Sequence, residues 1–586
     1  MDENCRRRIL SEDYYDFILY EAIPRVGRTF DLGEDYCIQS LLNEFGILYI
    51  SGSGLPPLNY NNYLYADIPL LYTTVQDMEN QAGRVEMAAN SAPDYEALSD
   101  SGILELQNSA LALRGRGVLL GYIDTGIDYR NSVFQYSDGS SRIAAIWDQT
   151  VQSGTPPQLF DYGSEYTTDV INQALSSETP YEIVPSRDEN GHGSAMAGVQ
   201  AAPEAMIAMV KLKPAKQYLR SFYCVKPDAL AYSETDILTG LKYLDMLAAQ
   251  LDMPLVLVLG LGTNLGDHNG NSILAGYCNS LIDKSNRAIA IAGGNEGNAR
   301  HHYYGEMQRT GNGGVSGTNA GIDTVEIRVG EEDGQFMFEL WGNRPDILSI
   351  DIRSPGGETI PRIQARKSYS EQYRFLYEST TVKVDYLVGE TLTGAELIMV
   401  SFLNPTPGIW TIGIYAEENG ISASFPESSS CKFHMWLPIT GFISDNTYFL
   451  LPNPDVTLTE PSYASSALTL STYQSSNDSF YIRSGRGYSR TGKIKPDLSA
   501  PGVDISTVGG SRTASCMAAA IAGGALAQYA EWAYVRGNEP AFRMTDMKYY
   551  LYRGAARDSQ LTYPNRLWGY GRLNIKGAFD AMRAIL

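Results

Sequence analysis

Four short apolar runs constrain the fold of this chain more than any other feature. They lie at Gly117–Ile123, Ala205–Leu212, Leu255–Leu259 and Ala288–Ala292, and they show no polar alternation. Such runs are typical of parallel strands that are buried on both faces. After Ser233, leucines and isoleucine recur at helical spacing, so helices alternate with the strands. The pattern predicts an α/β fold with a doubly wound parallel sheet and helical crossovers.

The N-terminal residues 1–95 have a different character. Tyr14–Glu21 and Gly46–Ser51 are strand-like, and we expect a short helix over Asp35–Glu44 between them. A polar, turn-rich stretch from Gln76 to Ser101 follows, which is typical of a linker or a processing segment. We therefore expect a small α+β unit that precedes the main domain.

A block of β character interrupts the α/β pattern. Six short apolar strands lie between residues 321 and 460, separated by Gly, Pro and Asn turns, as in an antiparallel sandwich or jelly roll. The α/β pattern returns after residue 460. The predicted organisation is therefore an α/β domain formed by residues 96–320 and 461–586, with the β domain inserted at 321–460.

Bulk composition excludes several classes of partner. The 586 residues carry a net charge of −22, so we expect neither nucleic acid nor an anionic membrane as a partner. Six cysteines without a CxxC pair predict isolated thiols in a reducing compartment. The start of the sequence lacks an apolar signal region, and no apolar run approaches eighteen residues. We expect a protein kept in the cytoplasm of the producing cell or inside a structure that this cell builds.

Four residues stand at positions where catalytic groups would converge. Asp124 ends a predicted strand, His192 begins a helix between glycines, and Asn295 follows another strand. Ser515 begins a helix of small residues. Each has an ordinary alternative: a turn for Asp124 and Asn295, a packed ring for His192 and a helix N-cap for Ser515. Together they could form a nucleophile, a base, an orienting carboxylate and an oxyanion donor.

The motifs DTGID, GHGSAMAG, AGGNEGN and TASCMAAAIAGG, in this order, resemble the subtilisin-like serine peptidases over residues 100–320 and 460–586. The resemblance implies that Ser515 is the nucleophile, His192 the general base, Asp124 its orienting carboxylate and Asn295 the oxyanion donor. It also implies that substrate binds along two glycine-containing segments, Gly260-Leu261-Gly262 and Gly293-Gly294. No metal or cofactor is expected, and the partner is a protein or peptide substrate.

The segment around Ser515 departs from the family pattern. Thr513-Ala514 precede the serine where the family has Gly-Thr, which could narrow specificity or lower activity. Gly523, eight residues after Ser515, is taken to fix the register. We expect Cys516 to be a small packed side chain, with a redox brake on catalysis as the alternative. His268, His301 and His302 fit no zinc spacing and are expected in packing or at the surface.

A narrower resemblance is to the clostridial Csp-type germination proteases. It rests on segments such as Trp147-Asp-Gln-Thr150 and Gly297-Asn-Ala-Arg-His301-His302, and on the place of the β insertion. It implies an autoprocessed zymogen and a prodomain that acts as chaperone and inhibitor and stays in the cleft. We expect cleavage within Tyr72–Ser101, a monomer, and activation of a cortex-lytic zymogen in spore germination. The alternatives are a regulatory pseudoprotease that binds a partner, and a glycan-binding β domain.

Overall fold

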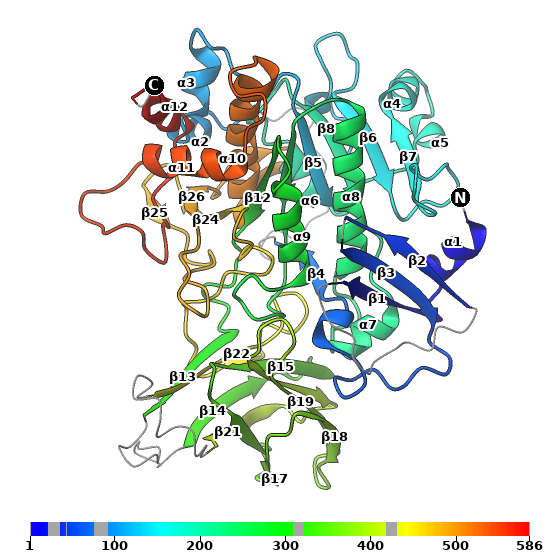
Figure 1. The fold of residues 1–586 in the computed structure, drawn as a ribbon, viewed down its shortest axis with the longest axis vertical. Helices are drawn as coiled ribbons and strands as arrows, with labels where there is room; N and C mark the ends of the chain where they lie inside the picture. The colour runs from blue at the N-terminus through cyan, green and yellow to red at the C-terminus, as the bar shows by residue number, and fades with distance from the viewer. Residues whose placement is uncertain are drawn as a thin grey trace.

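The computed structural model describes residues 2–21, 35–42, 44–75, 92–308, 322–417 and 430–584. Three parts are visible in Figure 1: an α/β core, a β sandwich at one end, and a small N-terminal unit packed against the side of the core. Part of the expected linker, residues 76–91, lies outside the described residues. The catalytic-type motifs all lie in the core.

The core is a mixed α/β structure built on a largely parallel sheet, as predicted. Its strand order is β25-β24-β12-β10-β5-β8-β6-β7, with β26 beside β24. The four predicted apolar runs form the adjacent strands β12-β10-β5-β8 at its centre, and all three pairings among them are parallel. The strands are β5 (Leu119–Asp124), β6 (Ile143–Asp148), β7 (Ser164–Thr167), β8 (Met206–Lys211), β10 (Leu255–Leu259), β12 (Arg287–Ala292), β24 (Leu468–Gln474), β25 (Ser479–Phe480) and β26 (Leu498–Pro501).

Helices cover the sheet, and two of them show how local sequence sets their place. Ser233 caps α8 (Glu234–Gln250), because its hydroxyl accepts the Thr235 N–H. The small residues of α10 (Ser515–Ala530) let it approach the sheet closely: a Cβ on Gly523 would lie 2.4 Å from Val258 Cγ2. The other core helices are α2 (Tyr95–Asp100), α3 (Ile103–Asn108), α4 (Thr168–Leu175), α5 (Pro180–Ile183), α6 (His192–Ala197), α7 (Gln217–Phe222), α9 (Ile273–Ile282), α11 (Met544–Gly554) and α12 (Ile575–Arg583).

In the part that the structure describes, the N-terminal unit is built around a three-stranded antiparallel sheet and a helix. Its strand order is β1 (Tyr14–Tyr20), β3 (Phe45–Ser51) and β2 (Tyr36–Ser40), and α1 (Glu3–Leu10) packs beside them. The prediction of a helix over Asp35–Glu44 is wrong. Residues 36–40 pair with β3, with Tyr36 opposite Ile50, so sheet formation overrides the local helical pattern.

The prediction of six isolated thiols is also wrong. Cys5 and Cys37 form a disulfide between α1 and β2, with 5.5 Å between their Cα atoms. The two cysteines are 32 residues apart, and only the packing of α1 on the sheet brings them together. Cys224, Cys278 and Cys516 are free thiols and are buried, and Cys431 is buried in the β domain.

The inserted β domain consists of two antiparallel sheets around a separate apolar core. All six predicted strands are present, and β13 extends the domain to residues before 321. The sequence patterns missed β13, β17, β18, β22 and β23. One sheet has the order β13 (His302–Gln308), β22 (Ser430–Trp436), β15 (Gln335–Gly342), β20 (Glu396–Leu403), β19 (Thr381–Val388) and β18 (Ser368–Arg374). The other has the order β17 (Thr359–Ile363), β16 (Leu348–Arg353), β21 (Gly408–Ala416), β14 (Ile322–Val329) and β23 (Tyr448–Phe449).

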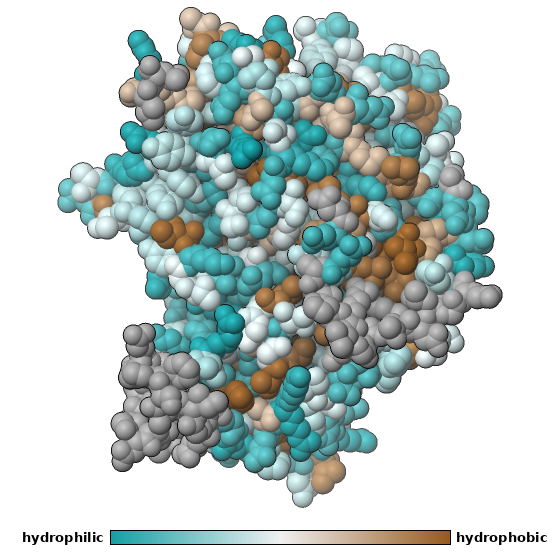
Figure 2. All heavy atoms as spheres, in the orientation of Figure 1, coloured by the Kyte–Doolittle hydropathy of each residue, from teal (hydrophilic) through white to brown (hydrophobic). Residues whose placement is uncertain are grey.

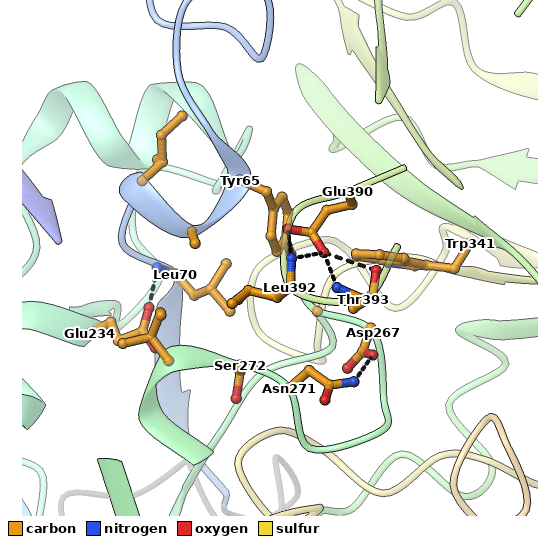
Figure 3. Close-up of a pocket in the computed structure, with 14 residues that line it drawn as sticks. Tyr65, Leu70, Glu234, Asp267, Asn271, Ser272, Trp341, Glu390, Leu392 and Thr393 are labelled. Carbon is orange, nitrogen blue, oxygen red and sulfur yellow. Dashed lines mark hydrogen bonds between the residues drawn. The ribbon is translucent and has the colours of Figure 1, made fainter. Parts of the chain in front are cut away.

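The three parts of the chain meet around a small cavity, drawn in Figure 3. Glu234 of the core accepts the Leu70 N–H of the N-terminal unit at 2.9 Å. Tyr65 of that unit stacks edge-on against Trp341 of the sandwich, with 5.5 Å between ring centroids. Glu390 of the sandwich folds back onto the Leu392 N–H at 3.0 Å. The N-terminal unit therefore contacts both other parts.

The face drawn in Figure 2 mixes hydrophilic residues with scattered apolar ones. Among the described residues, every helix is too short or too polar to cross a bilayer.

Candidate active site

Asp124 and His192 form a buried pair at the carboxyl edge of the sheet. Asp124 ends β5, His192 begins α6, and His192 Nδ1 lies 2.8 Å from Asp124 Oδ1 and 2.9 Å from Oδ2. The close approach depends on Gly193, where a Cβ would lie 2.2 Å from the Gly126 carbonyl oxygen. Burial alone would lower the pKa of His192, but the Asp124 carboxylate and Cys516 raise it well above the ordinary value. Asp124 is thus placed to orient the imidazole and to stabilise its protonated form.

Asn295 lies just beyond the end of β12, beside the start of α10. Its Oδ1 accepts the Ser515 backbone N–H at 3.0 Å. This bond turns the amide NH₂ group the other way, and Nδ2 has no hydrogen-bond partner among the described residues. A fixed donor without a partner is what a developing oxyanion requires.

The predicted nucleophile Ser515 is fully buried and engaged elsewhere. Its Oγ accepts the Gly294 N–H at 3.0 Å. In the described part of the chain, His192 Nε2 makes no hydrogen bond of regular geometry, so the structure does not join Ser515 to the Asp124–His192 pair. The structure therefore brings Asp124 to His192 and Asn295 to Ser515, but leaves the two pairs unconnected. Thr513 does not enter the site: its Oγ1 accepts the Asp504 N–H at 2.9 Å.

A strand of the N-terminal unit occupies the predicted substrate groove. The strand β4 (Leu71–Thr74) lies between β9 (Tyr232–Ser233) and β11 (Leu261–Gly262) and is antiparallel to both. Thr74 is opposite Leu261 and Thr73 is opposite Gly262, and the Val75 N–H donates to the Gly260 carbonyl at 2.8 Å. Gly260, Leu261 and Gly262, which the family resemblance predicts to bind substrate, thus pair with an extended segment of the chain itself.

Gly293 and Gly294, the other glycines predicted to bind substrate, make backbone hydrogen bonds within the core. The Gly293 N–H donates to the Leu470 carbonyl at 2.9 Å, and its carbonyl accepts the Thr459 N–H. Gly294, at φ +94°, directs its N–H to Ser515. Gly293 therefore holds β24, and Gly294 holds Ser515 at the start of α10.

A cavity of about 430 Å³ lies beside Asn295, and Val75 is one of the residues that line it. Its wall includes Glu296, whose carboxylate is 2.7 Å from His301 Nδ1 and accepts the Thr440 N–H at 3.1 Å. Burial would raise the pKa of Glu296, but His301 and these hydrogen bonds lower it. The position of Asn295 and Glu296 after a strand was a sequence signal for this cavity. No sequence signal pointed to the lining residues from the β domain, which are Ile439, Thr440, Asp445 and Tyr448.

His268, His302 and His434 are buried and pack against other side chains, whereas His301 pairs with Glu296. His268 stacks on Trp436 at 3.9 Å between ring centroids, and His302 Nε2 lies 2.9 Å from His434 Nδ1. Burial lowers the pKa of His268 to about 4. Across the residues that the structure describes, no three His, Cys, Asp or Glu side chains converge as metal ligands.

Comparison with solved structures agrees with this architecture. The chain is similar to the CspB protease of Clostridium perfringens, with 28% sequence identity, a TM-score of 0.72, and coverage of 84% of this chain and 98% of that one. The chain is more weakly similar to the PatG macrocyclase domain, with 12% identity, a TM-score of 0.38, and coverage of 85% of this chain and 100% of that one. It is also weakly similar to the subtilisin-like protease Apa1 of an Antarctic Pseudoalteromonas, with 11% identity, a TM-score of 0.29, and coverage of 82% of this chain and 96% of that one. These two similarities are too weak to support an argument. No family model and no curated protein matches the chain.

The fold and the similarity to the CspB protease identify a subtilisin-like endopeptidase, a hydrolase of the serine-peptidase class. Within that class the chain resembles the Csp-type peptidases, because its similarity to the CspB protease extends over 84% of the chain.

Proposed function

We propose that this peptidase cleaves its own chain after Val75 and that the N-terminal unit then stays in the groove as an inhibitor. The observation that carries the proposal is the antiparallel pairing of β4 with β9 and β11. Main-chain pairing of this kind is how an extended peptide binds at a strand edge. Val75 lies at the end of the paired segment, beside Asn295 in the shared cavity. The bond after Val75 is therefore the first that the catalytic residues would meet.

The site residues have definite roles in this cleavage. His192 takes a proton from the nucleophile, predicted from the sequence to be Ser515, as it attacks the Val75 carbonyl carbon. Asn295 Nδ2 donates to the oxyanion, and His192 passes the proton to the leaving nitrogen of Gln76. Water then hydrolyses the acyl-enzyme. The products are a fragment of residues 1–75 and a chain that begins at Gln76.

Intact-mass measurement tests the proposal. The expressed wild-type chain is expected to separate, on denaturation, into a fragment of residues 1–75 and the remainder, with Gln76 as the new N-terminus. His192→Ala removes the base and is expected to leave the chain at full length. Full-length wild-type protein after prolonged incubation contradicts autoprocessing, and a new N-terminus elsewhere contradicts the position.

We also propose the physiological role of the Csp type. In this role the N-terminal unit assists folding of the core, the β domain is the jelly roll that braces it, and the processed enzyme activates a cortex-hydrolysing zymogen during spore germination. Similarity to the CspB protease supports this role. Incubation of the processed enzyme with a purified cortex-lytic zymogen should shorten the zymogen, while the His192→Ala protein should not.

A further inference from the structure

Two adjacent side chains at the start of α10 compete for the position of the nucleophile. Ser515 and Cys516 are the first two residues of the helix. Successive residues of an α-helix point about 100° apart, so only one of the two can face His192. Building on the proposed peptidase function, we propose that the thiol of Cys516, not the hydroxyl of Ser515, is the nucleophile that His192 activates.

The contacts of Ser515 suit a supporting residue. Its Oγ accepts the Gly294 N–H, and its own N–H donates to Asn295 Oδ1, each at 3.0 Å. A nucleophile in this frame needs its side chain on the histidine and its N–H free for the oxyanion. Ser515 meets neither requirement, because both of its polar groups bond to the loop after β12. Its role is to hold Asn295 in place.

The contacts of Cys516 suit the nucleophile. Cys516 is 1% exposed, and its side chain is close enough to the His192 ring to help raise the pKa of that ring. His192 is itself 5% exposed, and its Nε2 has no hydrogen-bond partner among the described residues. As the second residue of α10, Cys516 has an N–H without an intrahelical acceptor. The preceding N–H in the chain, that of Ser515, donates to Asn295 Oδ1. Asn295 Nδ2 has no hydrogen-bond partner among the described residues, so it and the Cys516 N–H are both available as donors.

The sequence could not decide between the two residues because the helix carries two adjacent glycines. Gly523 is eight residues after Ser515, and Gly524 is eight residues after Cys516. Both are required by packing: a Cβ would lie 2.4 Å from Val258 Cγ2 at Gly523 and 2.2 Å from Ala201 Cβ at Gly524. The glycine spacing therefore fits either register.

The chemistry with a thiol balances without any redox partner. His192 Nε2 takes the Sγ proton, and the thiolate attacks the Val75 carbonyl carbon to form a C–S bond. The C–N bond breaks, its electron pair stays on the Gln76 nitrogen, and His192 protonates that nitrogen. A thioester remains on Cys516. Water, deprotonated by His192, attacks the thioester carbon, and sulfur leaves and recovers its proton.

Autoprocessing of four variants tests the assignment. Cys516→Ala should stay at full length, Cys516→Ser should process through the hydroxyl, and Ser515→Ala should process more slowly because Asn295 is less well supported. Cys278→Ala, at a buried free thiol in α9, is the matched control and should process like the wild type. Processing of Cys516→Ala overturns the proposal. If Ser515→Ala at the same time stays at full length, Ser515 is the nucleophile.

Chemical labelling separates this proposal from autoprocessing itself. Iodoacetamide should modify Cys516 faster than Cys278, and His192→Ala should slow the Cys516 reaction at least about tenfold, since the base no longer helps to form the thiolate. A fluorophosphonate probe should label Cys516→Ser at residue 516 and leave the wild type unlabelled. If the wild type is not processed but its Cys516 shows this His192-dependent labelling, the cleavage proposal fails and the assignment stands. Fluorophosphonate on Ser515 of the wild type overturns the assignment.

Discussion

At the scale of single residues, the Asp124–His192 pair is the best-defined part of the site. Asp124 is 1% exposed, and besides His192 it accepts the Thr125 N–H at 2.7 Å. These bonds fix the orientation of the imidazole ring. The pair was predictable because both residues sit at the ends of elements that the sequence already defines.

Asp124→Asn should lower the rate of processing about 10³–10⁴-fold at neutral pH, because an amide favours the wrong imidazole tautomer and does not stabilise its cation. The first-order rate of appearance of the 1–75 fragment measures the effect. Asp128→Asn, at a partly buried carboxyl close by in the chain, serves as control and should change the rate far less. Equal rates for Asp124→Asn and the wild type contradict the assigned role.

At the scale of secondary-structure elements, β4 connects the N-terminal unit to catalysis. Val75 is 3% exposed and donates its N–H to the Gly260 carbonyl. Neither the length nor the composition of the chain shows that this segment runs between β9 and β11. The expected cleavage range, Tyr72–Ser101, included Val75 without singling it out.

Val75→Pro should slow processing by at least about tenfold, since proline has no N–H to donate to Gly260. Val75→Ala keeps that N–H and is the matched control, so it should process within a few-fold of the wild type. The same mass assay gives both rates. Similar rates for the two variants would show that the Val75–Gly260 bond does not place the scissile bond.

The sandwich contains a carboxyl that makes its stability depend on pH. Glu396 Oε2 accepts the Leu348 N–H at 2.6 Å, which joins the two sheets, while its Oε1 has no hydrogen-bond partner among the described residues. Burial raises the pKa of Glu396 from 4.5 to about 8. Between these values the folded protein keeps a proton that the unfolded chain has released, so the free energy of unfolding falls as pH rises through this window.

Glu396→Gln should remove this part of the pH dependence. The amide oxygen can still accept the Leu348 N–H, and nothing titrates. The loss of melting temperature between pH 5 and pH 8.5 should be smaller in the variant than in the wild type by roughly 2–4 °C. Calorimetry at the two pH values measures it, and an identical loss in both proteins contradicts the argument.

At the scale of the whole molecule, the junction in Figure 3 ties the N-terminal unit to the other two parts. The Tyr65 hydroxyl donates to Glu339 Oε1 of the sandwich at 3.0 Å, and Glu339 Oε2 accepts the Gly266 N–H of the core at 2.9 Å. One carboxyl therefore bridges all three parts. Burial raises the pKa of Glu339 to about 7.

Tyr65→Phe should weaken the hold on the processed N-terminal unit about 5–20-fold, because a buried carboxyl oxygen loses its donor. The dissociation rate of the 1–75 fragment after processing measures the effect. Tyr63→Phe is the matched control, since the Tyr63 hydroxyl donates to Pro56 within the unit at 3.1 Å. Equal dissociation rates for Tyr65→Phe and Tyr63→Phe contradict a bridging role.

The sequence by itself determined the parallel sheet, the six predicted strands of the insertion, and the places of Asp124, His192 and Asn295. These features are encoded locally, because buried strands read as apolar runs and their ends carry the motif residues. Tertiary structure alone decided the strand at Tyr36–Ser40, the Cys5–Cys37 disulfide and the insertion of Val75 into the groove, because each depends on partners far away in the chain. It also decided which side chain of α10 faces His192, since that depends on the rotation of the helix against β12, which a run of small residues with two adjacent glycines does not specify.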